Sequence, residues 1–291
     1  MISKYLVKKW FKMIFGLSNM YVPQPMGKFF SKTEIRGYYN DLTNKVKKEK
    51  RGFGELPLDE ETGKPTEFSI QVFQYGLGAY DCFLGSHDKR YLDTFFACVR
   101  FAVSKQRSDG GWETFKNRPS PFSSMAQGEG VSLLCRAFVE TNDPQYLPLI
   151  QKAISFMKSA TMKTTEDGPV FYEFVGSPIV LNGWIFSLFG IVDYALLTQK
   201  QEDALFLKSC LCKLKKMLPF FDTGKWSLYR EDGRYVSSFY MGVHIAQMEA
   251  LYQLTDDPIF KEFGDRWSKY LHNPFRKMHY FWKKAIQKLK E

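Results

Sequence analysis

The sequence predicts an all-α protein, an α/α toroid built from repeated helix hairpins. Helical segments recur along the body of the chain at steps of roughly 55 residues. Each recurring helix is preceded by a second, more apolar helix, so that the repeating unit is a hairpin. These preceding helices are apolar almost all round, as in LNGWIFSLFGIVDYALL, which is what a buried inner ring requires. An α-solenoid shares the repeat, but the apolar inner helices favour the closed toroid.

The N-terminal part, residues 1–67, is predicted to hold a basic amphipathic helix and a connecting segment. Apolar residues recur at three- and four-residue steps over residues 2–17, and Lys8, Lys9 and Lys12 lie mostly between them. At most one short β-hairpin is expected before the toroid, around residues 56–68.

The toroid is assigned to residues 68–272. Inner helices are predicted at residues 69–84, 124–140, 180–197 and 240–254, and outer helices begin near Asp88, Asp143, Glu202 and Asp257. An acidic first turn is typical of a helix N-terminus, and Pro144 and Pro258 lie near the first helical position. Three hairpins end in an Asp-Gly or Asp-Thr-Gly turn, which ends a helix and reverses the chain.

Residues 273–291 are predicted to form a second basic amphipathic helix, and the charge of the chain sits mainly at its ends. Of the net charge of +10, residues 1–50 contribute +8 and residues 261–291 contribute +6, which leaves the body at −4. Because a nucleic-acid binder usually carries its basic patch on the folded body, no nucleic-acid partner is expected. The basic ends suit an anionic membrane surface, although both helices could instead dock on the body.

Several classes of site are not expected. The five cysteines form no CxxC pair and fall in apolar helical stretches. The four histidines show no HxxxH or HExxH spacing, so no metal is predicted. The chain has no Walker loop and no GxGxxG motif, and no other cofactor is predicted. Lysines interrupt every apolar run near the N-terminus, and we therefore expect no signal peptide and no transmembrane helix, with a cytoplasmic location at the inner membrane face.

The toroid brings equivalent loops together at one mouth. The residues that follow the three turns are Trp112 and Glu113, then 171–174, then 226–229. Aromatic rings, phenols and a carboxylate therefore converge from three separate loops, which predicts a binding cleft there.

The chain also resembles a known family over residues 68–271. The blocks that carry the resemblance are FSIQVFQYGLGAY (68–80), SSMAQGEGVSLLCRAF (123–138), VLNGWIFSLFGIVDY (180–194), MLPFFDTGKWSLY (217–229) and SSFYMGVHIAQMEALYQLTDDPIFKEFGDRW (237–267). They are similar to the C-terminal helical domain of the D-glucuronyl C5-epimerases, which convert glucuronic to iduronic acid in heparan sulfate and heparin precursors. The resemblance implies an α/α toroid, in agreement with the repeat.

The resemblance implies a catalytic cleft with a glutamate and tyrosines. Glu173 matches the catalytic glutamate of the family, and Tyr229 and Tyr240 match two cleft tyrosines. We expect Glu173 and Tyr240 to form an opposed acid/base pair, with Tyr229 assisting. The family has a tyrosine directly after the glutamate, where this chain has Phe174; Tyr172 is expected to supply that phenol.

Other residues are expected to bind the substrate. Arg230 and Arg234 are the nearest cations for a substrate carboxylate. Four more candidates are Trp112, Gln127, Asn182 and His244. A structural role stays open for each of them: the tryptophan could plug the toroid, the glutamine could cap a helix, the asparagine could hold a loop, and the histidine could pack in the core.

The leading hypothesis is a uronate C5-epimerase that acts on a heparosan-like polysaccharide or oligosaccharide. A polysaccharide lyase shares the first step, abstraction of the C5 proton. An inverting glycoside hydrolase needs two carboxylates, and Glu113 with Glu173 is the obvious pair. A non-catalytic scaffold of polysaccharide synthesis is a further alternative, supported by Phe174. The expected partners are the anionic substrate and a membrane surface, and a homodimer stays open.

Overall fold

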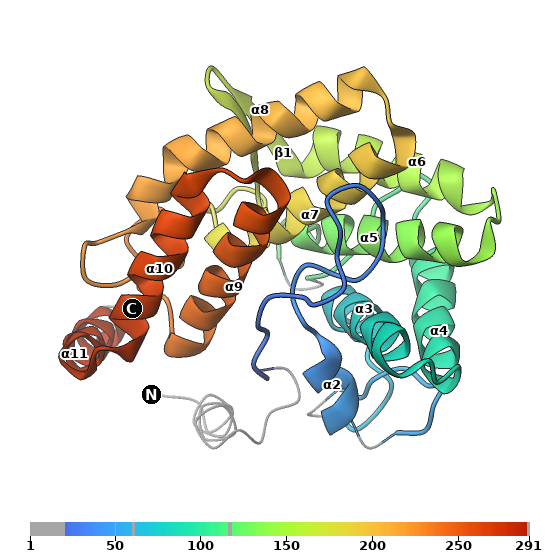
Figure 1. The fold of residues 1–291 in the computed structure, drawn as a ribbon, viewed down its shortest axis with the longest axis horizontal. Helices are drawn as coiled ribbons and strands as arrows, with labels where there is room; N and C mark the ends of the chain where they lie inside the picture. The colour runs from blue at the N-terminus through green and yellow to red at the C-terminus, as the bar shows by residue number, and fades with distance from the viewer. Residues whose placement is uncertain (1–20, 50, 60–61, 116–117, 290–291) are drawn as a thin grey trace.

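The computed structural model describes residues 21–289 apart from residues 50, 60–61 and 116–117, and the helix predicted at residues 2–17 lies outside this part. Helix hairpins follow one another around an arc (Figure 1). The pairs are α3 (Ser69–Ser86) with α4 (Arg90–Lys105), α5 (Ser124–Thr141) with α6 (Tyr146–Phe156), α7 (Leu181–Thr198) with α8 (Gln201–Met217), and α9 (Ser238–Thr255) with α10 (Pro258–His272). The predicted helical toroid architecture is confirmed.

The inner helices α3, α5, α7 and α9 end in the same way. Each has a C-cap residue in the left-handed region, which stops the helix and turns the chain. These residues are His87, Asn142, Gln199 and Asp256, with φ of 58°, 53°, 53° and 55°. In three of the hairpins an aspartate then accepts a backbone hydrogen bond at the start of the outer helix: Asp88 from Arg90, Asp143 from Gln145 and Asp257 from Ile259. Because this turn recurs in each hairpin, the sequence shows the repeat of roughly 55 residues.

Glycines let α5 and α7 pack backbone to backbone. A Cβ atom added to Gly190 would lie only 2.5 Å from the Cα of Gly128, and one added to Gly128 would lie 2.6 Å from the Cα of Ser187. Helix α7 is long and apolar enough to cross a membrane, yet 72% of that window is buried inside the fold. This burial is what a core helix of the toroid requires.

Extended structure is sparse in the described part of the chain. Strands β1 (Met162–Thr165) and β2 (Gly168–Phe171) form an antiparallel hairpin around the predicted Asp-Gly turn, with Met162 opposite Phe171. The hairpin follows a π-helical turn, η1 (Met157–Thr161), and a 3₁₀ turn, η2 (Leu218–Phe221), follows α8. Of the β-hairpin expected before the toroid, a single antiparallel bridge between Leu58 and Pro65 is described.

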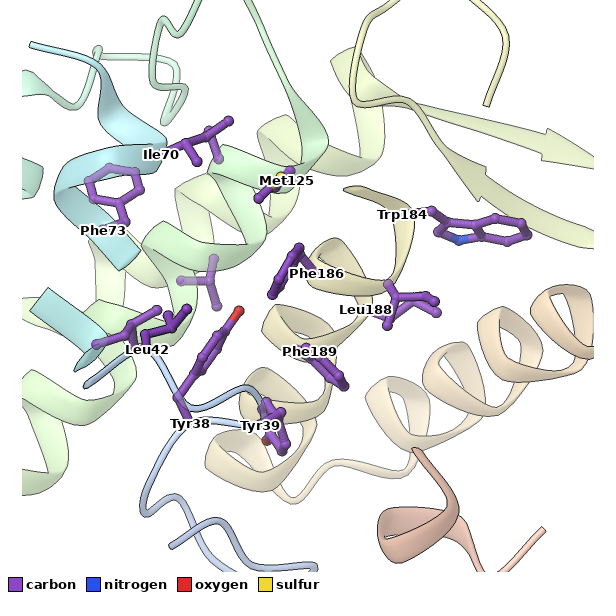
Figure 2. Close-up of a cluster of buried hydrophobic side chains, with 14 of the residues drawn as sticks. Tyr38, Tyr39, Leu42, Ile70, Phe73, Met125, Trp184, Phe186, Leu188 and Phe189 are labelled. Atoms are coloured by element: carbon purple, nitrogen blue, oxygen red, sulfur yellow. The ribbon is translucent and has the colours of Figure 1, made fainter. Parts of the chain in front are cut away.

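The N-terminal segment 21–48, which the sequence analysis placed outside the toroid, packs against its inner helices and ends in the short helix α2 (Thr43–Lys48). It lies in the opening between α3 and α9 (Figure 1). Tyr38 and Tyr39 are buried against α7 (Figure 2): the ring centroids of Tyr38 and Phe186 are 6.4 Å apart, and those of Tyr39 and Phe189 are 4.5 Å apart.

A buried ion pair anchors this segment. Arg136 of α5 donates to Asp193 of α7 at 2.7 Å, and both side chains are almost completely buried. The same guanidinium donates to the carbonyl of Gly37 at 2.8 Å, and the hydroxyl of Tyr39 donates to Asp193 at 2.8 Å. The segment is therefore tied to two inner helices, α5 and α7, at once.

Helix α11 (Pro274–Leu289) follows α10 after a single residue, where the sequence predicted the second basic helix. The cysteines are all unpaired, and four of them (Cys82, Cys98, Cys135 and Cys210) are buried, while Cys212 is partly exposed.

Candidate active site

A cavity of about 280 Å³ lies where the inner helices begin. Its lining combines a carboxylate, phenols, amides, a lysine and apolar side chains: Tyr21, Gln24, Lys45, Phe68, Ile70, Gln74, Phe115, Met125, Glu173, Phe174, Asn182, Phe186, Tyr229, Phe239, Tyr240 and Val243. Apolar walls with a few convergent polar groups are typical of a small-molecule site.

The first turns of the four inner helices converge on this cavity. Ile70, Met125, Asn182 and Tyr240 are the second or third residues of α3, α5, α7 and α9. The N-terminus of a helix carries partial positive charge, so this arrangement favours an anionic ligand. Of the residues that the repeat predicted to converge at one mouth, Glu173, Phe174 and Tyr229 line this cavity, whereas Trp112 and Glu113 do not.

Glu173 follows β2 and precedes α7, and its side chain lies against the first turn of that helix. The residue is 7% exposed, and burial raises the pKa of its carboxyl group to about 8, although nearby Arg118 lowers it. Among the described residues, the Oε2 atom of Glu173 and the Oδ1 atom of Asn182 have no hydrogen-bond partner. Two buried polar atoms are thus available to a ligand at the same wall of the cavity.

Gly183 makes this position possible. A Cβ atom on Gly183 would lie 2.6 Å from the Oε2 atom and 2.7 Å from the Cβ atom of Glu173. A Gly183→Ala variant is expected to displace the carboxylate and to lower activity by at least about 10²-fold, since small misplacement of a catalytic group is costly. Gly242→Ala in α9 is the matched control, because nothing lies within 4 Å of its added Cβ. Equal activities of the two variants, at equal thermal stability, would contradict this placement of Glu173.

Three phenols face the cavity together. The ring centroids of Tyr229 and Tyr240 are 5.3 Å apart, and those of Tyr21 and Tyr240 are 6.3 Å apart. Tyr240 also forms a side-chain hydrogen bond with Tyr21. Burial raises the pKa of Tyr229 and of Tyr240 well above 10, and the charge of Glu173 adds to both shifts. Both tyrosines therefore keep their protons at neutral pH and can act as proton donors.

Sequence reasoning missed the residues that the N-terminal segment contributes, namely Tyr21, Gln24 and Lys45. Lys45 lines the cavity although it is only 7% exposed. Burial raises the pKa of the nearby Glu129 well above its usual value, and the positive charge of Lys45 opposes this shift. Gln74 donates to the Oε1 atom of that glutamate at 2.7 Å. A buried ammonium group is a natural partner for a ligand carboxylate, yet no local pattern marks Lys45, because it lies in a short helix whose position depends on distant contacts.

Arg118 is the second cation that sequence reasoning missed. Its guanidinium lies over the ring of Phe174, 4.0 Å from the centroid, and 5.5 Å from the centroid of Phe115. Phe174, which stands where the related family has a tyrosine, thereby supports an exposed arginine at the edge of the cavity.

Three predicted site residues lie in the core instead of the cavity. Trp112 is fully buried between α3 and α4: its indole donates to the carbonyl of Ala102 in α4 at 2.8 Å, and its ring centroid lies 5.3 Å from that of Phe73 in α3. Gln127 braces it by accepting from the backbone of Trp112 at 3.2 Å and donating back at 3.0 Å. His244 is buried beside Trp267, and burial lowers the pKa of its imidazole to about 3. A buried histidine that stays neutral contributes to the packing of the core.

The remaining predicted residues lie beside the cavity. Tyr172 is half-buried and is not in its lining. Arg230 pairs with Asp232. The backbone carbonyl of Arg234 accepts from the backbone of Tyr229 at 2.6 Å. Burial raises the pKa of Tyr229, and the charge of the Arg234 guanidinium opposes that shift. In the described part of the chain, the structure therefore brings Glu173, Tyr229, Tyr240 and Asn182 around one cavity, whereas the two predicted arginines flank it.

The fold and the site define an α/α-toroid protein with a carboxylate and phenols around one cavity. No group of three or more His, Cys, Asp or Glu side chains that could hold a metal is found among the described residues. The family described as D-glucuronyl C5-epimerase C-terminus matches residues 106–269, more than half of the chain. The chain belongs to this family.

A curated relative and two solved structures illustrate the likeness. The chain is 28% identical over 226 residues to the D-glucuronyl C5-epimerase of Caenorhabditis elegans, a match that covers 63% of this chain and 36% of that protein. The chain thus spans about a third of this relative. An α-mannanase from Bacteroides thetaiotaomicron (TM-score 0.55, 14% identity, 72% of this chain and 59% of the other) and an unsaturated glucuronyl hydrolase specific for heparin (TM-score 0.53, 14% identity, 72% and 63%) share the fold.

Proposed function

We propose that the protein is a uronate C5-epimerase that converts D-glucuronic to L-iduronic acid residues in a heparosan-like polysaccharide or oligosaccharide. The observation that carries the proposal is the placement of Glu173 and Tyr240 around one cavity in a chain of the epimerase family. The small volume suits one sugar residue at a time.

The C5 proton of a uronic acid is weakly acidic because the charge left by its removal spreads onto the adjacent carboxylate. In the proposed reaction, the ionised carboxylate of Glu173 takes this proton from one face of the ring. The hydroxyl of Tyr240 gives its proton to C5 from the opposite face, so that the C5–H bond is remade with inverted configuration. The proton on Glu173 returns to the tyrosinate through the neighbouring phenols or solvent, which restores the starting state.

Two features of the cavity stabilise the negative charge that develops on the substrate. Lys45 is the buried cation in the lining and is assigned to the substrate carboxylate. The positive ends of the inner helices point to the same place and require no reorganisation during the reaction. In this proposal Lys45 of the N-terminal segment takes the role that the sequence predicted for Arg230 or Arg234.

The alternative hydrolase pair is not assembled in this cavity. Glu113 is exposed, is paired with Arg107 at 2.9 Å, and lines a different pocket from Glu173. Incubation with heparosan in deuterated water, followed by mass spectrometry and NMR, distinguishes the reactions. An epimerase incorporates deuterium at C5 of intact chains. Unsaturated fragments would indicate a lyase, new reducing ends would indicate a hydrolase, and no change across a panel of uronate polymers would contradict a catalytic role.

The pH dependence follows from the raised pKa of Glu173. A base must be ionised to act, and this carboxyl group is mostly protonated below its pKa of about 8. We therefore expect kcat/KM for C5 exchange to rise about tenfold per pH unit from pH 6 toward 8 and then to level off. Because the phenols titrate well above 10, no fall is expected before pH 9. A flat profile between pH 6 and 8 would contradict Glu173 as the base.

A further inference from the structure

Helix α11 carries an exposed apolar face that the proposed reaction does not use. Four side chains on this helix are largely exposed: Phe275 (76%), Met278 (56%), Phe281 (63%) and Trp282 (69%). They recur at three- and four-residue steps and therefore lie on one side of the helix. Three of them, Met278, Phe281 and Trp282, form a shallow, open hollow together with Pro274 and Lys277. Exposed apolar groups gathered in this way mark an interaction surface.

The opposite side of α11 holds the helix firmly on the body. The ring of Tyr280 stacks on Trp226 with centroids 4.5 Å apart and 12° between the planes. Lys284 donates to the carbonyl of Tyr235 at 2.5 Å, and Gln287 accepts from the backbone of the same tyrosine at 3.2 Å. The exposed face is consequently displayed by a docked helix and is fixed in orientation.

The charge of α11 indicates what covers this face. Its sequence, PFRKMHYFWKKAIQKL, has five Lys and Arg residues and no acidic residue. Lys277 borders the hollow and Lys283 follows Trp282 directly and is exposed. A second copy of the helix would bring like charges together, which opposes self-association through this face. An anionic membrane surface attracts the lysines and also buries the aromatic rings.

We propose that α11 is an interfacial helix that binds the surface of a membrane containing anionic lipids. Phe275, Met278, Phe281 and Trp282 enter the boundary between headgroups and acyl chains, while the lysines contact the lipid headgroups. The hollow is shallow and is formed by side chains of one helix, so that a broad lipid surface can reach all of them. A groove that binds a peptide would instead have walls from neighbouring elements. This inference is independent of the proposed reaction.

Flotation of the full chain with two kinds of vesicle tests this proposal. Vesicles of phosphatidylcholine with about 30% phosphatidylserine are expected to retain the protein, and pure phosphatidylcholine vesicles are expected to retain much less, since each basic residue near the surface adds to the binding. Raising the salt concentration should weaken the retention. Retention that is equal on both vesicles, or absent from both, would overturn the proposal.

Two variants attribute the binding to α11. A Phe275→Ser/Phe281→Ser/Trp282→Ser variant and a charge reversal, Lys277→Glu/Lys283→Glu, are each expected to weaken binding by about tenfold or more. Leu205→Ser in α8, also an exposed apolar residue, is the matched control and should bind like the unmodified chain. Unchanged binding of both α11 variants would overturn the proposal. So would a concentration-dependent dimer that the triple variant abolishes, because that would assign the face to a second copy.

Discussion

A Glu173→Gln variant is expected to lose both C5 deuterium exchange and conversion of glucuronate to iduronate, by about 10²–10⁴-fold, the usual contribution of a general base. Glutamine keeps the size of the side chain and cannot take a proton. Since Glu173 is buried with its pKa raised, the neutral amide should not unfold the protein. The loss should therefore appear in kcat, with an unchanged melting temperature.

Glu113→Gln is the matched control for this experiment. Glu113 lies on the loop of the neighbouring repeat, is exposed and lines another pocket, and its variant is expected to keep the activity of the unmodified chain. Full activity of Glu173→Gln would remove this residue from the reaction. Equal losses in both variants would indicate two working carboxylates and favour a hydrolase.

An Arg136→Met variant is expected to lower the free energy of unfolding by about 3–5 kcal/mol, because it leaves the buried carboxylate of Asp193 without its cation. It also removes the donor to the carbonyl of Gly37, which loosens the N-terminal segment. Since that segment supplies Tyr21 and Lys45 to the cavity, the variant should lose activity at temperatures where it is still folded. Urea denaturation and C5 exchange measure the two effects.

The exposed ion pair of Lys261 and Asp265 provides the control for the buried pair. Lys261→Met should leave the urea midpoint unchanged, because exposed pairs contribute little to stability. The double variant Arg136→Met/Asp193→Asn should recover part of the lost stability, since it removes the uncompensated charge. Strictly additive losses in the double variant would show that the two side chains do not act as a buried pair.

Local patterns predicted the helical body of this protein well. The inner helix predicted at residues 180–197 is α7 (Leu181–Thr198), and the other inner helices agree as closely. The reason is that every hairpin has the same turn, a left-handed C-cap followed by an acidic helix start, and this turn is local in sequence. Glu173 and Tyr240 could be selected because they adjoin these repeated elements and match the family.

Residues that depend on distant contacts could not be predicted. Lys45 reaches the cavity because Tyr38 and Tyr39 pack against α7 and because Arg136 holds Gly37. These contacts join positions about a hundred or more residues apart, and no periodicity records them. Trp112 shows the opposite case. It lies directly after a repeated turn, as a cleft residue would, yet its indole is buried and donates to the carbonyl of Ala102 in the outer helix α4.

The central claim is that two groups on opposite faces of the sugar exchange the C5 proton. Deuterium labelling with a Tyr240→Phe variant tests this claim most directly. With Glu173 intact and the opposite donor removed, the variant should still place deuterium at C5 of glucuronate, with retained configuration, while iduronate formation falls by about 10²-fold or more. NMR of the recovered polymer reads both outcomes in one sample. Iduronate formation at the rate of the unmodified protein would contradict the account.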